Sequence, residues 1–278
     1  MNSILQLLLS HQMLVLATAT FGGMLFFLTL ETLWPRRAED GTSVLRLSNN
    51  LLLACVNFIA VLLLSHLLAA SGWLQQLALF GGLTQLGPVT SFCILFLVLE
   101  AFMYGIHRIY HTIPLLWRIH AVHHCDTEVD ATTSQRHHTL EVLINTALLA
   151  PVLVLLAPEP AVFLLVALTR LAIGIFSHSN LQVPKFVDRC LRWVLVTPDF
   201  HRLHHRSQRT FTDSNYSASL PLFDYLFGTA SDALYDQHTH FELGLEYLRT
   251  PADSHLHRLI ALPFRRTPFT TQAEQAHA

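Results

Sequence analysis

The sequence predicts an all-α protein, a polytopic membrane helical bundle with about four apolar helices plus a short-armed hairpin, and a His-rich cytosolic helical cap. Of its 278 residues, 52% are hydrophobic and only 13% are charged, half the share that is usual in a soluble domain. The mean hydropathy of +0.42 also favours a membrane protein. Eighteen histidines occur, many in short clusters beside apolar runs. We expect residues 1–278 to form a single membrane-embedded domain.

Apolar runs of membrane length define the expected helices. A spanning helix needs roughly 20 apolar residues. Residues 13–34 and 49–70 reach this length, and residues 89–106 fall slightly short of it. Residues 141–176 form a longer apolar stretch with a Pro-Glu-Pro interruption at 158–160. This stretch therefore predicts a tight helical hairpin whose arms are just long enough to cross.

The N-terminal end of the chain lacks the features of a cleaved signal peptide. No basic residue precedes the first apolar run, and no small-residue cleavage site follows it. We therefore expect this run to be a retained span, with transmembrane helices distributed over residues 13–106.

The distribution of basic residues predicts the orientation of the chain. Cytoplasmic loops carry an excess of Lys and Arg. Residues 1–12, residues 71–88 and the hairpin tip hold none, whereas most of the arginines lie near the histidine clusters or after residue 180. Every clustered histidine is thus expected on the cytoplasmic side, and residues 231–278 are expected to form a cytosolic tail. The sixteen arginines, against Lys185 alone, and the abundant Leu and Ala hint at a GC-rich bacterial genome, and we expect the membrane to be a bacterial inner membrane. The net charge of −2 gives no reason to expect a nucleic-acid partner.

Three clusters of histidines have the spacing of metal ligands on helices. His107 and His111 are four residues apart, so on a helix their rings share one face. The pattern His-x-x-His-His then occurs twice, and the second copy follows Pro198, which favours a helix beginning near residue 199. These two copies consist of His120, His123, His124, His201, His204 and His205.

Eight clustered imidazoles are more than one metal ion can bind. Neutral imidazole suits Fe, Zn, Cu and Ni, and burying so many rings without partners would be costly. Two adjacent metal ions are the simplest way to use them. His138 and His178 are single candidates for further ligands, and the sequence leaves open whether His137 or His138 points inward.

The remaining histidines are more simply explained as surface or hydrogen-bonded residues. This applies to His11, His66, His255, His257 and His277. His238 and His240 could form a metal pair, but we favour the same simple explanation for them.

The motifs resemble, in order, those of the fatty acid hydroxylase/sterol desaturase superfamily of membrane non-haem di-iron enzymes. H-R-x-x-H begins at His107, L-W-x-x-H-x-x-H-H ends at His124, and R-x-H-x-x-E ends at Glu141. F-x-H-x-N surrounds His178, T-P-x-x-H-R-x-H-H ends at His205, and a closing N-Y…D…F-G-T lies within 215–229. The resemblance covers about residues 95–230, which are expected to form the di-iron region.

The chain departs from the usual pattern of the superfamily at four positions. Glu100 stands where Asp is common and Gly105 where an aromatic residue is common. Thr139 replaces a usual Pro, and Phe223 replaces a usual Trp. None of these changes removes a motif histidine. They therefore concern the surroundings of the metal and the fit of the substrate.

The resemblance implies two iron ions and a set of ligands. The implied ligands are His107, His111, His120, His123, His124, His178, His201, His204 and His205, with His138 either a tenth ligand or a neighbour of the ligands. Glu100, Asn180 and Asp224 are expected to accept the second ring N–H of ligating histidines. Arg136 is expected either to hold these partners or to form a structural salt bridge.

The resemblance also implies a reaction, in which O₂ is activated at reduced di-iron and a hydrogen is abstracted from an unactivated C–H bond of a membrane lipid. The outcome is hydroxylation or desaturation of a sterol, fatty acyl or isoprenoid chain. Electrons are expected from an external reductase with a ferredoxin or cytochrome, because the sequence has neither a G-x-G-x-x-G fingerprint nor a cysteine set for an Fe–S cluster.

A membrane metal transporter, or another metal-binding protein, is the alternative that uses the clusters as transit sites. Transport sites usually lie at mid-membrane depth on polar residues within the spans. The predicted spans contain almost no such residues, so the sequence favours an enzyme over a transporter.

Overall fold

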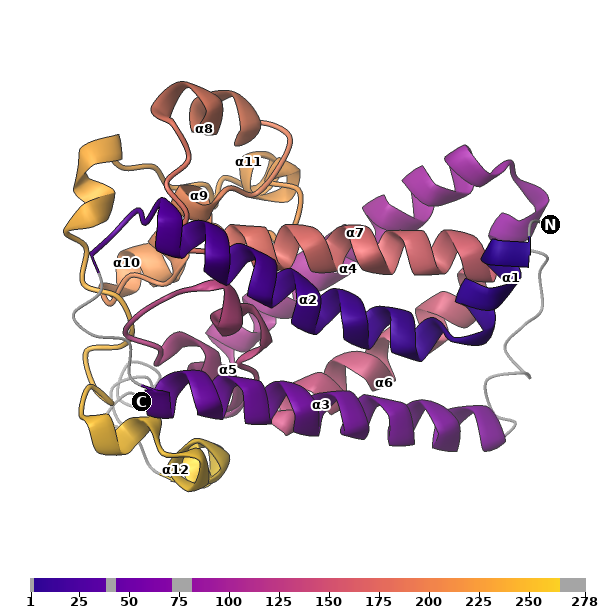
Figure 1. The fold of residues 1–278 in the computed structure, drawn as a ribbon, viewed down its shortest axis with the longest axis horizontal. Coiled ribbons are helices and arrows are strands. Elements are labelled where there is room, and N and C mark those ends of the chain that lie inside the picture. Colours follow the sequence, from indigo (N-terminus) through magenta and orange to yellow (C-terminus); the bar gives the residue numbers. More distant parts are fainter. Residues whose placement is uncertain (1–2, 39–43, 72–81, 266–278) are drawn as a thin grey trace.

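The computed structural model describes residues 3–38, 44–71 and 82–265. Within them, five helices are long and apolar enough to cross a membrane. They are α2 (Gln12–Leu33), α3 (Val44–Ala70), α4 (Pro88–Thr112), α6 (Thr139–Leu156) and α7 (Pro160–His178). They run side by side along the long axis of the molecule (Figure 1). The predicted all-α membrane bundle is confirmed, and the chain is an integral membrane protein.

Shorter helices gather at the two ends of this bundle. Helix α1 (Ser3–Ser10) lies at the end that carries the N-terminus (Figure 1). The opposite end holds α5 (Pro114–His124), α8 (Lys185–Leu191), α9 (Pro198–His204), α10 (Arg209–Thr212), α11 (Leu222–Phe227) and α12 (Leu256–Ala261). The 3₁₀ turns of the described residues are η2 (Gly82–Gln85), η3 (Ala131–Gln135), η4 (Tyr235–Thr239), η5 (Pro251–Ser254) and η6 (Leu262–Phe264). We call the end that holds α5 and α8–α12 the cap.

The predicted apolar runs coincide with the long helices, and α3 and α4 extend beyond their runs. Helix α4 continues past residue 106 to Thr112, so His107 and His111 lie in the last turns of a helix that spans the membrane. The hairpin turns at Ala157, whose φ of 40° is left-handed, and Pro160 takes the first position of α7. Proline is favoured there because the first turn leaves its N–H groups unpaired. The predicted hairpin is therefore confirmed.

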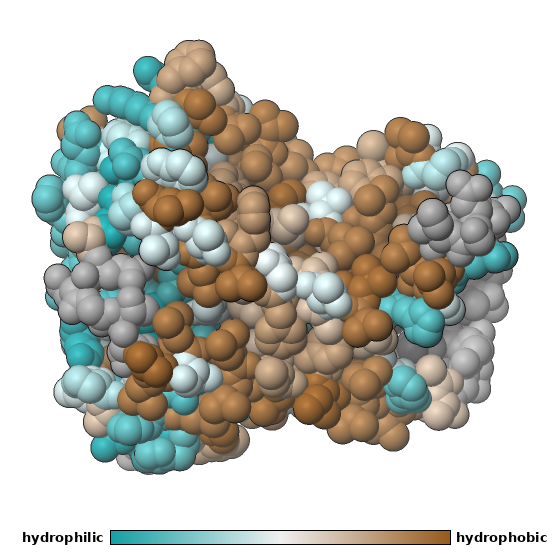
Figure 2. Space-filling view, in the orientation of Figure 1, coloured by the Kyte–Doolittle hydropathy of each residue, from teal (hydrophilic) through white to brown (hydrophobic). Residues whose placement is uncertain are grey.

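The surface of the molecule divides between the spans and the cap. Brown, apolar residues cover the half of the molecule that contains the long helices, whereas the hydrophilic residues gather largely at the cap end (Figure 2). Inside the bundle, α4 and α7 pack through Leu95, Leu99, Val162 and Val166, all of which are buried.

The described part of the C-terminal region packs against α5. Leu245 and Leu259 are buried in one apolar cluster with Trp117 and Ala121 of α5 and with Leu53 of α3. This contact closes the cap over the ends of the long helices and positions α5, which carries three of the expected ligands: His120, His123 and His124.

Arg46 ties the start of α3 to the segment that follows α5. Its guanidinium is buried and contacts the carboxylates of Asp126, at 3.2 Å, and Asp130. Removing one partner of a buried ion pair leaves an uncompensated charge, which costs about 3–5 kcal/mol. We expect Arg46→Ala to lower the free energy of unfolding in detergent by about that amount.

Arg258 provides a matched control for this prediction. It pairs with Asp253 at 3.3 Å, but its side chain is 39% exposed. Exposed ion pairs contribute about 0–1 kcal/mol. Equal destabilisation by Arg46→Ala and Arg258→Ala, measured by chemical unfolding, would contradict the role assigned to Arg46.

Candidate metal centre

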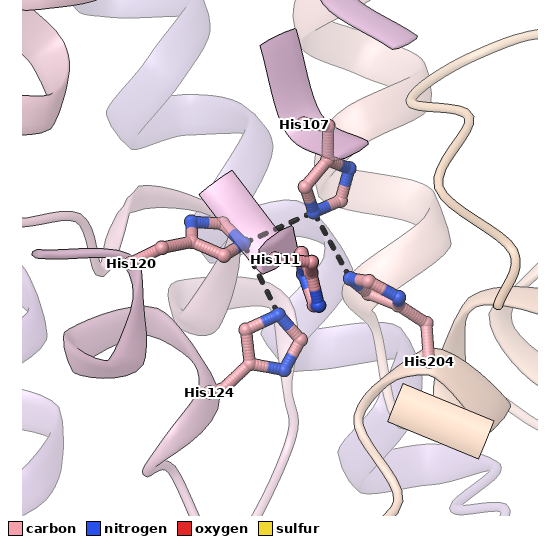
Figure 3. A group of neighbouring side chains, drawn as sticks. All are labelled: His107, His111, His120, His124 and His204. Carbon is pink, nitrogen blue, oxygen red and sulfur yellow. Dashed lines mark hydrogen bonds between the residues drawn. The ribbon is translucent and has the colours of Figure 1, made fainter. Parts of the chain in front are cut away.

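Five histidine rings from three helices meet at the end of α4 (Figure 3). Helix α4 contributes His107 and His111, α5 contributes His120 and His124, and α9 contributes His204. One nitrogen of each ring lies within 4.8 Å of one nitrogen of every other ring. The i, i+4 spacing puts two rings on one face of α4 and two on one face of α5. We call these five residues the first histidine group.

A second group of four buried rings lies beside the first. It consists of His123 from α5, His178 at the end of α7, His201 from α9 and His205 just after α9. Their ligand nitrogens also lie within 4.8 Å of one another. The rings of His124 and His205 stack at 4.7 Å between centroids, so the two groups adjoin. The structure thus brings together the nine histidines that the resemblance implied.

The first turn of α9 explains how one short helix supplies both groups. The Thr197 hydroxyl accepts a hydrogen bond from the backbone N–H of Phe200 at 3.3 Å, and Pro198 takes the first helical position. Both features stabilise a helix start. His201 and His204 then point to different groups from adjacent turns.

Oxygen acceptors fix one nitrogen of several rings. Nδ1 of His107 donates to the carbonyl of Tyr216 at 2.6 Å, and Nδ1 of His204 donates to the carbonyl of Ser214 at 2.7 Å. Nδ1 of His120 donates to the Glu141 carboxylate at 2.9 Å. Further contacts join His111 to Asp213 at 3.2 Å and His178 to the carbonyl of Gly174 at 2.7 Å. Such contacts fix the tautomer and orientation of the ring.

The other nitrogen of these rings points at another ring. Nε2 of His107 lies 3.0 Å from Nε2 of His120 and 3.0 Å from Nε2 of His204, as the dashed lines of Figure 3 show. All three rings donate through Nδ1, so in the neutral state each Nε2 carries a lone pair. Lone pairs that face one another at this distance repel unless a cation lies between them. The donor set therefore fits a metal ion.

In the second group the Nε2 atoms converge in the same way, although among the described residues only His178 has a carbonyl acceptor at Nδ1. Nε2 of His178 lies 3.3 Å from Nε2 of His123 and 3.0 Å from Nε2 of His201. Nε2 of His205 lies 3.2 Å from Nε2 of His201. These four nitrogens converge and fit a second metal ion.

Burial keeps the cap histidines neutral. Loss of solvent, reinforced by neighbouring rings, lowers the pKa well below the ordinary value for His123, His124, His201, His204 and His205. Neutral imidazole is the form that binds metal. These rings are therefore prepared for metal at neutral pH without first losing a proton.

The structure contradicts the expectation that His138 is a ligand or a neighbour of the ligands. His138 precedes α6, where its Nδ1 accepts from the N–H of Leu140 at 3.0 Å and caps the helix. Its Nε2 contacts the carbonyl of Ile260 at 3.1 Å. Both nitrogens are therefore engaged away from the two groups, because successive residues at a helix start point in different directions.

His137 takes the inward position instead. Its ring stacks on His123 at 4.4 Å between centroids, and its Nδ1 contacts Glu141 at 3.0 Å. Burial lowers the pKa of His137, but the Glu141 carboxylate outweighs this effect and raises the pKa above the ordinary value. His120, His137 and Glu141 thus form a hydrogen-bonded triad beside the metal centre.

Replacing these two neighbours by alanine should have opposite consequences. His138→Ala should cost about 1 kcal/mol of stability through the lost helix cap and leave the metal content unchanged. His137→Ala should leave stability nearly unchanged but weaken metal retention, because Glu141 loses one of its two partners. Unfolding curves and metal analysis of both purified variants check this, and metal loss in His138→Ala alone would reverse the assignment.

The four expected partners of the ligands do not contact the histidine rings. Glu100 accepts from Arg170 at 2.7 Å and from the N–H of Ser219 at 2.8 Å. Asp224 accepts from the N–H groups of Tyr216 and Ser217. Both carboxylates therefore hold the segment after α10, so their effect on the ligands passes through the Tyr216 backbone.

Asn180 and Arg136 are likewise structural. The Asn180 side chain bonds to the backbone of Arg37 at 3.1 and 3.0 Å. Arg136 donates to the carbonyl of Val122 at 2.9 Å and to Asn50 at 2.8 Å, and its guanidinium also contacts Cys125. It forms no salt bridge among the described residues, and it fastens the end of α5 through the backbone.

The acceptors that do contact the rings were missed for two reasons. Most are backbone carbonyls, which any residue can supply, and Asp213 lies about a hundred residues from His111 in the sequence. The contact of Glu141 could have been predicted, because Glu141 stands four residues after His137 and hence on the same side of a helix start.

The remaining histidines lie outside the two groups. His66 is exposed, with Nδ1 at 3.0 Å from the carbonyl of Leu62. His238 is buried with Nδ1 3.9 Å from Asp199, and neither it nor His240 belongs to a ligand group in the described part of the chain. His11, His255 and His257 also belong to none, and His277 lies outside the described residues.

Comparison with known proteins matches this site to one family. The family model described as "Fatty acid hydroxylase" matches residues 92–229, which include all nine histidines of the two groups. The chain belongs to the fatty acid hydroxylase family. The sequence resemblance to this superfamily is thereby confirmed. No solved structure matches the chain.

Curated relatives in the same superfamily act on lipids according to their names. Ornithine lipid hydroxylase OlsE of Rhizobium tropici is 33% identical over 144 residues, which are 51% of this chain and 42% of that protein. Alkylglycerol monooxygenase of Homo sapiens is 28% identical, over 48% of this chain and 29% of that protein. Very-long-chain aldehyde decarbonylase CER1 of Arabidopsis thaliana is 29% identical, over 65% and 28% respectively. The chain spans less than half the length of these relatives.

Proposed function

We propose that this protein is an O₂-dependent oxidoreductase that hydroxylates or desaturates a C–H bond of a membrane lipid at two non-haem iron ions. The observation that carries the proposal is the pair of adjoining histidine groups, whose Nε2 atoms converge at 3.0–3.3 Å. Membership of the fatty acid hydroxylase family and the lipid-oxidising names of the relatives support it.

The nine histidines would hold the metal, one ion in each group. Iron bound there would supply the activation of O₂ that an unactivated C–H bond requires. The protein's own part is to fix the rings. The acceptors on Nδ1 of His107, His120 and His204 keep each Nε2 unprotonated and directed inward. Nine nitrogen donors and no bound carboxylate favour iron over the oxygen-preferring Mg²⁺ and Ca²⁺.

Hydroxylation and desaturation require the same number of electrons and protons from outside the protein. In hydroxylation, one oxygen atom of O₂ enters the C–H bond and the other becomes water, with consumption of two electrons and two protons. In desaturation, two hydrogens leave neighbouring carbons and O₂ becomes two molecules of water, again with two electrons and two protons from outside. The sequence has no flavin or nicotinamide fingerprint, so we assign electron supply to a reductase with a ferredoxin or cytochrome.

We further propose that the cap faces the cytoplasm of a bacterial inner membrane. The excess of arginine near the cap and its absence from residues 1–12 support this orientation. In this arrangement residues 95–230 form the di-iron region of a single domain, and residues 231–278 belong to the cytosolic side. The electron donor would then reach the metal from the cytoplasm, and the lipid would reach it from the bilayer.

Lipid analysis of producing cells tests the proposal. Membrane lipids of cells that express the protein are compared with those of cells that express His204→Ala, under O₂ and under ¹⁸O₂. We expect a lipid that gains one labelled oxygen or loses two hydrogens only with the active protein. An unchanged lipid profile together with uptake of iron or zinc into vesicles would favour a transporter instead.

A further inference from the structure

A cavity of about 470 Å³ lies beside α4 and contains none of the histidines of the two groups. This volume is typical of a ligand pocket. Two helices line it: α4 on one side and α11, from the cap, on the other. Its lining includes Ala101, Gly105, Arg108, Thr112, Phe223 and Phe227.

The polarity of the cavity changes along α4. Ala101, Gly105, Arg108 and Thr112 recur every three or four residues and so share one face of the helix. The apolar end, at Ala101, is toward the bilayer centre, and the polar end, at Arg108 and Thr112, is where the spanning helix stops. At 1.5 Å per residue, Arg108 is roughly 10 Å nearer the boundary than Ala101. A molecule that fills this cavity therefore has an apolar part within the membrane and a polar part at the membrane boundary.

Arg108 supplies an accessible positive charge at the polar end. Its side chain is exposed, and among the described residues no carboxylate lies within 4.0 Å of it. Its guanidinium contacts the ring of Tyr104, at 5.8 Å from the centroid. Guanidinium groups bind phosphate and carboxylate through paired hydrogen bonds. The charge of the cavity thus matches an anionic group.

The apolar side of the cavity opens toward lipid rather than water. A Cβ atom built on Gly105 meets nothing within 4 Å, so the helix leaves open space there. Ile109 and Phe227 line the cavity, yet 45% and 60% of their surfaces are exposed. The neighbouring Leu226 is 65% exposed. Apolar residues that are exposed beside a spanning helix continue the lipid-facing surface.

We infer that this cavity binds a membrane lipid with an anionic headgroup. The phosphate or carboxylate lies on Arg108, and the adjoining part of an acyl chain follows α4 past Gly105 toward Ala101. Phe223 and Phe227 cover the chain from the cap. The inference goes beyond the proposed function because it concerns lipid binding at a separate cavity and needs no oxidation chemistry.

The cavity is separated from the first histidine group by one layer of aromatic rings. Tyr104 stacks on Phe227 at 5.4 Å and meets Tyr216 at 6.3 Å between centroids. Tyr216 in turn lies 5.7 Å from His107. A lipid held by Arg108 is therefore positioned next to the metal centre.

Lipid binding by the full chain in detergent tests the inference. The probes are dioleoylphosphatidylglycerol, which is anionic, and dioleoylphosphatidylcholine, which is zwitterionic, measured by native mass spectrometry. We expect one phosphatidylglycerol per chain, bound at least tenfold more tightly than phosphatidylcholine. Arg108→Gln should remove this preference, and Gly105→Phe, which fills the cavity, should weaken both lipids about tenfold. Arg189→Gln, which changes an exposed arginine of α8, should change neither.

Two results would overturn the inference. The first is an undiminished preference for phosphatidylglycerol in Arg108→Gln, which would place the headgroup elsewhere. The second is displacement of the lipid by millimolar inorganic phosphate that is equally effective in wild type and Gly105→Phe, which would show an anion site without a chain site. Because neither readout depends on iron, both results are independent of the proposed reaction.

Discussion

His204→Ala is expected to abolish lipid oxidation and to remove most of the bound iron, while the protein still inserts into the membrane. His204 is fully buried in α9, and its Nε2 lies 3.0 Å from that of His107 in the first group. Changing a residue that merely supports a ligand weakens metal binding or activity by about 10–100-fold, so loss of a ligand itself should exceed this. Elemental analysis of purified protein should fall from about two irons per chain to one or fewer.

His66→Ala is the control for this experiment. His66 lies on the spanning helix α3, is exposed, and bonds only to the backbone of its own helix among the described residues. Its replacement should leave activity and iron content unchanged. An active His204→Ala variant with two irons would refute the ligand assignment. Loss of metal in His66→Ala would show that the site lies at a different depth in the bilayer.

Glu141→Gln is expected to weaken iron binding by about 10–100-fold, although Glu141 is not one of the nine proposed ligands. Its carboxylate Oε1 accepts from Nδ1 of His120 at 2.9 Å and from Nδ1 of His137 at 3.0 Å, in a buried position. A glutamine has one carbonyl oxygen and no negative charge, so it orients the ring of His120 less strongly. Titration of the iron-loaded protein with a chelator measures the loss.

Glu100→Gln is the matched control, because Glu100 is another buried carboxylate that contacts no ligand ring. It accepts from Arg170 and from the backbone of Ser219. We expect this variant to lose stability, but the protein that remains folded should hold iron as tightly as wild type. Equal weakening of iron binding in both variants would show that Glu141 acts through general stability rather than through His120.

Helical periodicity made much of the site predictable. Within one helix, residues four apart share a face whatever surrounds them, so His107 with His111 and His120 with His124 could be paired from spacing alone. The apolar runs likewise fixed where the spanning helices lie, because a bilayer demands roughly 20 apolar residues. These are local properties of the chain.

The partners of the rings were not predictable, because they are set by how distant segments pack. The carbonyls of Tyr216 and Ser214 and the carboxylate of Asp213 reach rings of other helices from one irregular segment. Every residue type has a backbone carbonyl, so the sequence does not show which carbonyl accepts from a ring. The expectation that Glu100 and Asp224 would contact the rings was wrong, because both instead hold the segment that carries Tyr216.

His137 and His138 show that packing also decides the roles of two adjacent residues. Both are histidines beside an apolar run, so residue type and spacing do not show which of them points inward. The start of α6 separates them, because His138 caps the helix while the preceding residue stacks on His123. By itself, the sequence determined the membrane helices, the family and the within-helix histidine pairs, since each depends on residue type and spacing. Only the tertiary structure decided which rings share a group and which oxygen holds each ring, since both depend on contacts between segments far apart in the chain.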